Sequence, residues 1–394
     1  MAQEHNFTLY EGEKLKCLRD HHAVYKYIPG HDPAKPLVAF VPGMAHNARI
    51  AYGGHAGHRS EDFLAHWFNH HGYGFLGISY PLETDPPMMP VSSSNFTIPE
   101  WGQQAADAID AVITEHNLSR SVVVLVWSMG GKILQPVTVA AKRLGIAIEL
   151  FISLAATPAL PGLLTAVSKT QLDKTTAGYA TKPFLEKAFL RQMDEQDKIN
   201  HEIDEKDMVT QKNAAPRHII DPTIFKRDYI GATPIGITAS GFRYDAATKE
   251  FVKEDNEWQF MDDGQAHDYA NLPAMAAIYP TSALDFRHAI TDKATWSFLM
   301  IQRAMAKMTQ DGTATAYQQI GDDGAAALSQ ARFRFQEMQR VVMNIPELMT
   351  AEILGNHFFF VGESGARQTV ETVVGFLENL VTIQQDIAYE LSSL

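Results

Sequence analysis

The chain has 394 residues, of which 45% are hydrophobic and 20% charged, a balance typical of a globular protein and not of a disordered or fibrous one. Its formal net charge of -13 opposes binding to nucleic acid or to anionic membranes, because both repel an acidic surface. The single cysteine, Cys17, excludes an internal disulfide and a thiolate metal cluster, and it favours a reducing compartment.

The first 20 residues lack the basic head and apolar core of a signal peptide, and no segment approaches 18 uninterrupted apolar residues. We therefore expect a cytoplasmic protein without a transmembrane helix. Its expected partner is a small-molecule substrate, with no nucleic acid, membrane or cofactor indicated. A homodimer is left open, because no heptad pattern supports a specific oligomer.

The first segments of the chain predict strands. FTLYEG (7–12), KLKCLR (14–19) and AVYKYIP (23–29) are short alternating runs, as in an antiparallel entry to a sheet. PLVAFVPG (36–43) is apolar without alternation, which indicates a strand buried on both faces of a parallel sheet. The spacing in 60–74 then predicts a helix, and YGFLGISYP (73–81) predicts another buried strand.

Residues 97–118 predict an amphipathic helix, with Thr97 and Glu100 forming a capping box. Its expected buried stripe consists of Ala105, Ile109, Val112 and Ile113. A strand at 121–127, a helix from about Gly131 and a strand at 147–158 follow. Strands that alternate with helices imply right-handed crossovers, so the predicted class is α/β, with a mostly parallel sheet covered by helices on both faces.

The pattern changes at about residue 158. Charged helical segments precede SGFRYDAATKEFVKEDNEW (240–258), which predicts a β-hairpin around 245–249. We predict a core of residues 1–158 and 271–394 and a mainly helical cap inserted at 159–270. A second helical insertion is expected at about 290–340. The sheet then resumes, and a long amphipathic helix is expected at about 367–391.

The segment SVVVLVWSMGGKI (121–133) is a buried strand that ends abruptly on Ser128. A serine hydroxyl is a poor nucleophile near neutral pH, so a hydrolase must present it beside a base and oxyanion donors. A sharp strand-to-helix turn does so, and it favours small residues two positions to either side. Gly130 fits this requirement and Val126 departs from it. The preceding buried strand and the Gly-Gly helix start lead us to predict a nucleophile rather than a simple helix cap.

Two backbone N–H groups are expected to hold the oxyanion. Met129 follows the serine at the start of a helix, and Met44 lies in a loop after an earlier strand, where Gly43 allows close approach. Three histidines follow in the same loop region, His46, His55 and His58. Their spacing matches no zinc site, so we predict no metal and interpret them as loop-surface or substrate-contacting residues.

The general base is expected on a loop after the last strand. EILGNHFFFVGE (352–363) places His357 after an apolar run and before the terminal amphipathic helix. Among the 16 histidines, it is the one at a strand end in the last part of the sheet. We therefore predict His357 as the base that activates Ser128.

Together these pieces resemble the α/β-hydrolase superfamily. The resemblance is carried by VPGMAHN (41–47), FNHHGYGFLGISYP (68–81), VWSMGGKI (126–133) and GNHFFF (355–360). It covers 36–158 and 346–394, whereas the middle of the chain, where these enzymes carry variable caps, matches nothing we can name. It implies an α/β-hydrolase fold and a triad of nucleophile, acid and histidine.

The third triad member should follow a strand between the nucleophile and the histidine. Asp285, after the apolar run in LPAMAAIYPTSALDF (272–286), is the preferred candidate, although its distance from His357 requires a second insertion. The alternatives that remain open are Asp245, which competes with the hairpin, Asp292, and Asp322 or Asp323, which have no convincing strand before them.

The resemblance implies a carboxylesterase-like serine hydrolase that forms an acyl-enzyme on Ser128. A serine at this position argues against the haloalkane and epoxide branches, which carry aspartate there. The Phe, Met and Leu content of the cap suggests a small, partly apolar substrate. The alternatives are an acyltransferase with the same triad, an amidase or peptidase, and an inactive ligand-binding protein with this fold.

Overall fold

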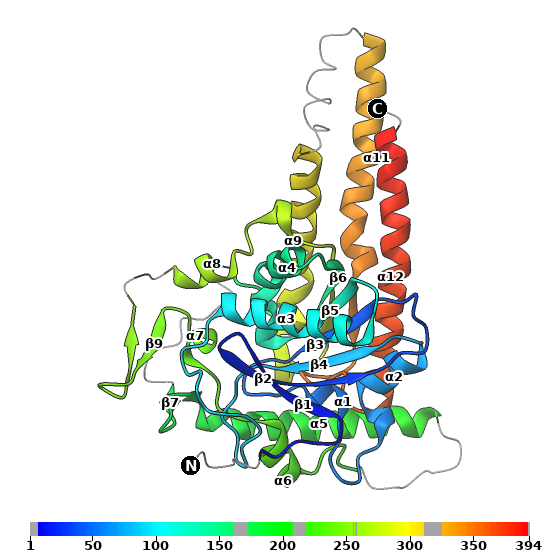
Figure 1. The fold of residues 1–394 in the computed structure, drawn as a ribbon. Helices are drawn as coiled ribbons and strands as arrows, with labels where there is room; N and C mark the ends of the chain where they lie inside the picture. Colours follow the sequence, from blue (N-terminus) through cyan, green and yellow to red (C-terminus); the bar gives the residue numbers. More distant parts are fainter. Residues whose placement is uncertain are drawn as a thin grey trace.

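The centre of the protein is an eight-stranded, mostly parallel sheet (Figure 1). The structure is a computed structural model that describes residues 7–160, 172–207, 217–254, 256, 258–310 and 325–392. The strand order is β1-β2-β4-β3-β5-β6-β11-β12, and β2 runs antiparallel to both of its neighbours. The strands are β1 Glu13–Leu18, β2 His21–Ile28, β3 Leu37–Val41, β4 Phe75–Ser79, β5 Ser121–Trp127, β6 Ala147–Leu154, β11 Met275–Pro280 and β12 Thr350–Ile353.

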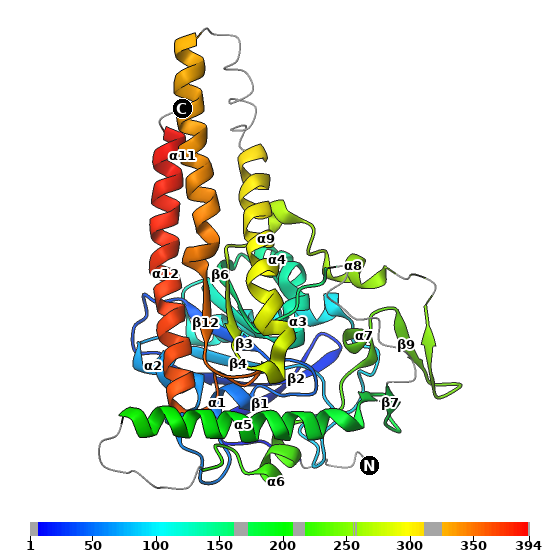
Figure 2. The ribbon, with the colours of Figure 1, turned by 180° about the vertical axis from the view of Figure 1, so that it is seen from behind.

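Helices cover both faces of the sheet (Figures 1 and 2). The helix α3 packs against α4 on one face, and α2 packs against α12 on the other. Thr97 and Glu100 form the predicted capping box at the start of α3, and the predicted stripe of that helix is buried. The helices of the core are α1 Arg49–Tyr52, η1 Ser60–Asp62, α2 Leu64–His70, α3 Ile98–His116, η2 Ser128–Ile133, α4 Leu134–Arg143 and α12 Glu363–Ser392.

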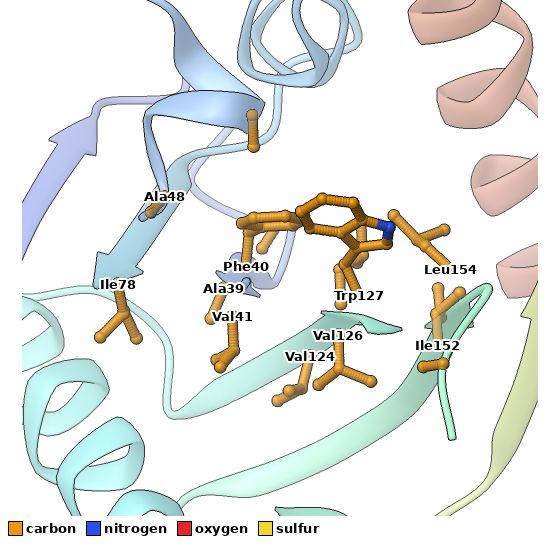
Figure 3. Packing of buried hydrophobic residues seen from close by; sticks show 14 of the residues in the cluster. Ala39, Phe40, Val41, Ala48, Ile78, Val124, Val126, Trp127, Ile152 and Leu154 are labelled. Carbon is orange, nitrogen blue, oxygen red and sulfur yellow. The ribbon is translucent and has the colours of Figure 1, made fainter. Parts of the chain in front are cut away.

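The central strands are apolar on both sides because both faces are covered. Figure 3 shows Phe40 and Trp127 on one side of the sheet and Val41 and Val126 on the other. Each of these side chains is fully buried. Burial of this kind contributes roughly 1.5–3 kcal/mol for each large side chain, so the core fixes the strand ends that carry the candidate site.

The segment between β6 and β11 is mixed, with helices and two small antiparallel pairs of strands. The hairpin β9–β10 is the one predicted from the sequence, with its turn at 246–249. The longest helix described in this segment, α5, crosses one end of the molecule (Figure 2). The elements are β7 Asp173–Lys174, β8 Ala180–Thr181, α5 Pro183–Asp207, α6 Pro222–Ile224, η4 Phe225–Tyr229, α7 Ile235–Thr238, β9 Phe242–Asp245, β10 Glu250–Lys253, α8 Gln259–Gly264 and η5 Tyr269–Asn271.

Two long helices lie between β11 and β12. After η6 Ala283–Asp285, the helices are α9 Phe286–Gln310 and α11 Ala325–Met349. They contact each other and, with α12, extend well beyond the sheet (Figure 1). The helical character predicted for about 290–340 is confirmed for the described part of this range, whereas the division into core, cap and insertion stays a prediction.

The α/β class and the mostly parallel sheet are confirmed, and one predicted strand is wrong. Residues 7–12 form no strand, although their residues alternate. Thr8 N–H donates to the Pro87 carbonyl oxygen at 2.9 Å, and the Tyr10 hydroxyl donates to Asp228 Oδ2 at 2.7 Å. The partial burial of this segment comes from its attachment to the loop at Pro87 and to η4. In the described part of the chain, no helix is long and apolar enough to cross a membrane.

Candidate active site

Ser128 is the first residue after β5, and its backbone is in the left-handed region with φ of +55°. Such a conformation costs a non-glycine residue about 1–2 kcal/mol, and residues held this way concentrate at functional sites. A Cβ on Gly130 would lie 3.1 Å from the Val41 carbonyl oxygen and 3.2 Å from Val126 Cβ. The turn therefore accepts the branched side chain of Val126 because Gly130 has no side chain of its own.

The loop after β3 lies directly against this turn. A Cβ on Gly43 would stand 2.5 Å from Ser128 Cβ, so only glycine lets the two backbones approach this closely. The Tyr80 hydroxyl donates to the Gly43 carbonyl oxygen at 2.7 Å, and Ala45 N–H donates to Thr233 Oγ1 at 3.0 Å. These bonds hold the loop on both sides of Met44.

The two backbone N–H groups predicted to hold the oxyanion lie at positions where an N–H group has no acceptor within its own element. Met129 is in the first turn of η2, where backbone N–H groups have no acceptor within the helix. Met44 N–H has no hydrogen-bond partner among the described residues. Met44, Ser128 and Met129 line one pocket.

His357 and Asp285 are brought together from the loops after the neighbouring strands β12 and β11. His357 Nδ1 and Asp285 Oδ2 are 2.8 Å apart. The indole N–H of Trp127, the residue before Ser128, donates to the His357 carbonyl oxygen at 2.9 Å. Among the described residues, no hydrogen bond joins Ser128 Oγ to His357. Catalytic hydrogen bonds are often long before a substrate binds.

The His357–Asp285 pair is largely buried, and its charge balance fixes the state of the carboxyl group. Burial disfavours the charged carboxylate, but the His357 imidazole opposes this by charge and by its hydrogen bond, and His288 and Arg287 act in the same direction. The pKa of Asp285 is therefore below its usual value. A carboxylate in this position fixes the imidazole tautomer with Nε2 free to accept a proton.

A second histidine–carboxylate pair lies beside the first, and sequence reasoning missed it. His288 Nδ1 lies 3.0 Å from both carboxylate oxygens of Asp292, one turn further along α9. The rings of His288 and His357 have centroids 5.1 Å apart. His288 lines the pocket that contains Ser128. The signal in the sequence was the spacing of four residues, which places two side chains on one helix face.

Asp285, His288 and His357 could hold a metal ion, because one ligand atom from each lies within 4.8 Å of the others. The prediction that this protein uses no metal stays a prediction. The arrangement also serves as a network of hydrogen-bonded acids and bases, since each imidazole Nδ1 already faces a carboxylate.

The other predicted acids lie elsewhere. Asp245 caps the turn of the β9–β10 hairpin, where its oxygens accept from Ala247 N–H and Thr248 Oγ1. Asp322 and Asp323 lie outside the described residues. Asp292 faces His288 and not His357 among the described contacts.

The interpretation of the loop histidines as surface residues is wrong for two of them. His46 is 1% exposed and lies among Trp127, Phe189, Phe225 and Phe358. Its pKa is lowered to about 3, mainly by burial and also by the nearby His357, while a hydrogen bond to the Met44 carbonyl oxygen opposes the shift. His55 is also buried and contacts the Tyr229 hydroxyl. Both are core residues that shape the loop.

The pocket at Ser128 has a volume of about 410 Å³. Its lining combines apolar side chains with cationic ones, and no pattern along the sequence predicted that these would meet. The apolar residues are Met44, Met129, Phe242 and Phe260, and the cationic residues are Lys132, Lys182, Lys253 and Arg287.

The strand order decides the fold. An eight-stranded sheet in which the second strand alone runs against the others, with a serine in a left-handed turn after the fifth strand, is the arrangement of the α/β hydrolases. The protein has the α/β-hydrolase fold. The fold implied by the sequence resemblance is thereby confirmed.

The chain matches no family model and no curated protein. Among solved structures it is similar to the thioesterase domain from the curacin biosynthetic pathway, with 12% identity over 93% of this chain and 100% of that one and a TM-score of 0.38. A structure reported with carboxylesterases of the thaumarchaeon Nitrososphaera gargenis shows 11% identity, coverage of 94% and 99%, and a TM-score of 0.40. An arylesterase shows 10% identity, coverage of 95% and 86%, and a TM-score of 0.41. These TM-scores are below 0.5, so the fold assignment rests on the strand order and turn geometry of this chain.

Proposed function

We propose that this α/β-hydrolase-fold protein is a serine hydrolase that cleaves a carboxylic ester through an acyl-enzyme on Ser128. The observation that carries the proposal is the strained, left-handed backbone of Ser128 at the wall of a pocket. Seven described non-glycine residues have a positive φ, and Ser128 is the one among them that lines this pocket. Glycine would fit the same turn at lower backbone cost, so a serine at this position favours a chemical role. The pairing of His357 with Asp285 near the same strand ends supports it.

In the proposed reaction, Ser128 Oγ attacks the ester carbonyl carbon while His357 Nε2 takes the hydroxyl proton. The carbonyl π electrons move to oxygen, and the Met44 and Met129 N–H groups stabilise that oxyanion. Collapse of the intermediate expels the alcohol, which receives the proton from His357. Water then attacks the acyl-enzyme with His357 as base, releases the carboxylic acid and regenerates the serine. Asp285 stabilises the imidazolium in both steps.

The pocket volume of about 410 Å³ suits a small substrate, and its methionine and phenylalanine side chains suit an apolar portion. A neighbouring pocket of about 230 Å³ shares Met44, Lys182 and Thr238 with the first. Two pockets that meet at Met44, next to the expected oxyanion position, would take the acyl and alcohol parts of an ester separately.

Labelling with a fluorophosphonate probe tests the proposal. We expect covalent labelling of the wild-type protein, assigned to Ser128 by peptide mass spectrometry, and none of Ser128→Ala. Lack of labelling in a folded sample would support the inactive ligand-binding alternative and overturn the proposal.

The reaction type needs a separate measurement. Turnover of p-nitrophenyl esters with little turnover of matched p-nitroanilides is expected for an esterase, and the reverse would identify an amidase or peptidase. An added alcohol or amine that diverts most of the acyl group from water would identify an acyltransferase.

A further inference from the structure

The pocket at Ser128 is strongly cationic in a protein of formal net charge -13. Lys132, Lys182, Lys253 and Arg287 line it, together with His288. No Asp or Glu occurs among the described lining residues. Lys132 and Lys182 both lose water contacts here and repel each other, so an anion bound between them would lower the free energy of the pocket.

Lys132 carries most of this cost, because it is 5% exposed and lies one turn after Ser128. Its Nζ donates to the Ile237 carbonyl oxygen at 2.6 Å, and the described residues include no salt bridge to Lys132 or to Lys182. Burial lowers the pKa of Lys132 to about 7, with Lys182 and Arg287 acting in the same direction and Asp263 opposing them. A buried ammonium group held by carbonyl oxygens alone is poorly compensated, and an anion would compensate it.

A neutral donor lies in the same lining. The Ser240 hydroxyl oxygen is buried and has no hydrogen-bond partner among the described residues. Buried hydroxyl groups in proteins are normally hydrogen-bonded, so an orphan hydroxyl in a pocket wall points to a ligand or solvent partner. The same pocket lining includes Lys132 and Lys182, which favours an oxygen-bearing anion as that partner.

We infer that the substrate hydrolysed at Ser128 carries a negatively charged group, a carboxylate or a phosphate, which binds in this pocket to Lys132, Lys182 and the Ser240 hydroxyl. The inference rests on the proposed function and specifies its substrate class. The apolar side chains of the pocket hold the chain that joins the anion to the ester, and the cations select for its charged end.

The kinetic test compares mono-p-nitrophenyl adipate with its neutral methyl ester, which differ in charge and little in length. We expect the anionic ester to have the higher kcat/KM. Lys182→Gln should lower kcat/KM for the anionic ester about tenfold more than for the neutral one, because a hydrogen bond to a charged group is lost. The matched control is Lys187→Gln on the exposed side of α5, outside the described linings of both pockets. Equal effects of Lys182→Gln on both esters would overturn the inference.

A binding measurement separates this inference from the proposed function. Titration calorimetry with adipate, adipamide and inorganic phosphate needs no turnover. Binding of adipate or phosphate without binding of adipamide, weakened in Lys182→Gln and kept in Lys187→Gln, is expected. The tighter of the two anions identifies the charged group. Hydrolysis of neutral esters without anion binding would overturn the inferred substrate class but would agree with the proposed esterase activity. Anion binding without fluorophosphonate labelling would support an anion site but would overturn the proposed hydrolase activity.

Discussion

Gly43 and Ser128 belong to different strand ends, yet a methyl group on Gly43 would stand 2.5 Å from Ser128 Cβ and 3.1 Å from its Oγ. Real Cβ atoms do not approach so closely, so any side chain at 43 must displace one of the two loops. The close approach brings the backbone of residue 44 beside the nucleophile, where the proposed oxyanion forms.

We therefore expect Gly43→Ala to damage catalysis more than folding. A displacement of about 1 Å at the oxyanion donors lowers kcat by about 10²-fold. Esterase kinetics and thermal unfolding of the same samples check this. Gly57→Ala is a useful comparison, because a Cβ there meets no atom within 4 Å, although its φ of +80° makes it strained as well. Normal kcat in Gly43→Ala would mean that this loop is not part of the catalytic site.

Ser128 itself allows a comparison of two inactive variants. Both Ser128→Ala and Ser128→Gly should lose at least about 10⁴-fold in kcat, because the triad acts as a unit. Only glycine relieves the left-handed strain at φ of +55°. Glycine also gives the unfolded chain more conformational entropy, which offsets part of this relief. The free energy of unfolding of Ser128→Gly should therefore exceed that of Ser128→Ala by a net amount of about 0.5–1 kcal/mol. Equal stabilities in urea denaturation would show that the turn is relaxed.

The two histidine–carboxylate pairs can be told apart by removing one carboxylate at a time. Asp285→Asn should lower kcat by up to about 10⁴-fold, because the asparagine stabilises the wrong tautomer of His357. Asp292→Asn should lower kcat far less, since it faces His288. A large loss of kcat in Asp292→Asn with a small loss in Asp285→Asn would identify His288 as the base. In that case His288→Gln would lower kcat more than His357→Gln.

His46 should make the protein less stable in mild acid. Its folded pKa is about 3, whereas the unfolded value is 6.5. Below pH 6.5 the unfolded chain therefore binds a proton that the folded protein does not, and stability falls as the pH decreases. Between pH 7 and pH 5 this group should cost about 2 kcal/mol. Urea midpoints at the two pH values should differ less in His46→Leu than in the wild type. The control His70→Leu changes an exposed residue on α2 and should keep the wild-type difference.

Much of the sheet was predictable because its central strands are buried on both faces and are therefore apolar along most of their length. β3 and β5 are examples, and the capping box of α3 marks its start to the residue. The prediction of a strand at residues 7–12 was wrong because alternation reflects partial burial, and a segment hydrogen-bonded to a loop and to η4 can be partly buried without being a strand.

The candidate site residues could be predicted where the backbone itself leaves a pattern in the sequence. Ser128 ends a buried run and precedes two glycines, and Asp285 follows an apolar strand. Lys132, Lys182 and Lys253 come together only through the folding of distant segments, so no local pattern signals their meeting. His46 was misread for the same reason, because its aromatic neighbours come from β5, α5, η4 and the loop after β12.

The partners of the His357–Asp285 hydrogen bond are 72 positions apart in the chain, so Asp285 is synthesised some time before His357. At a translation rate of 5–20 residues per second, a ribosome needs roughly 4 to 14 s to pass from the codon of one to that of the other. During that interval the nascent chain contains Ser128 but not His357, the proposed proton acceptor. The long helices α9 and α11 thus place the synthesis of the proposed base well after that of the proposed acid.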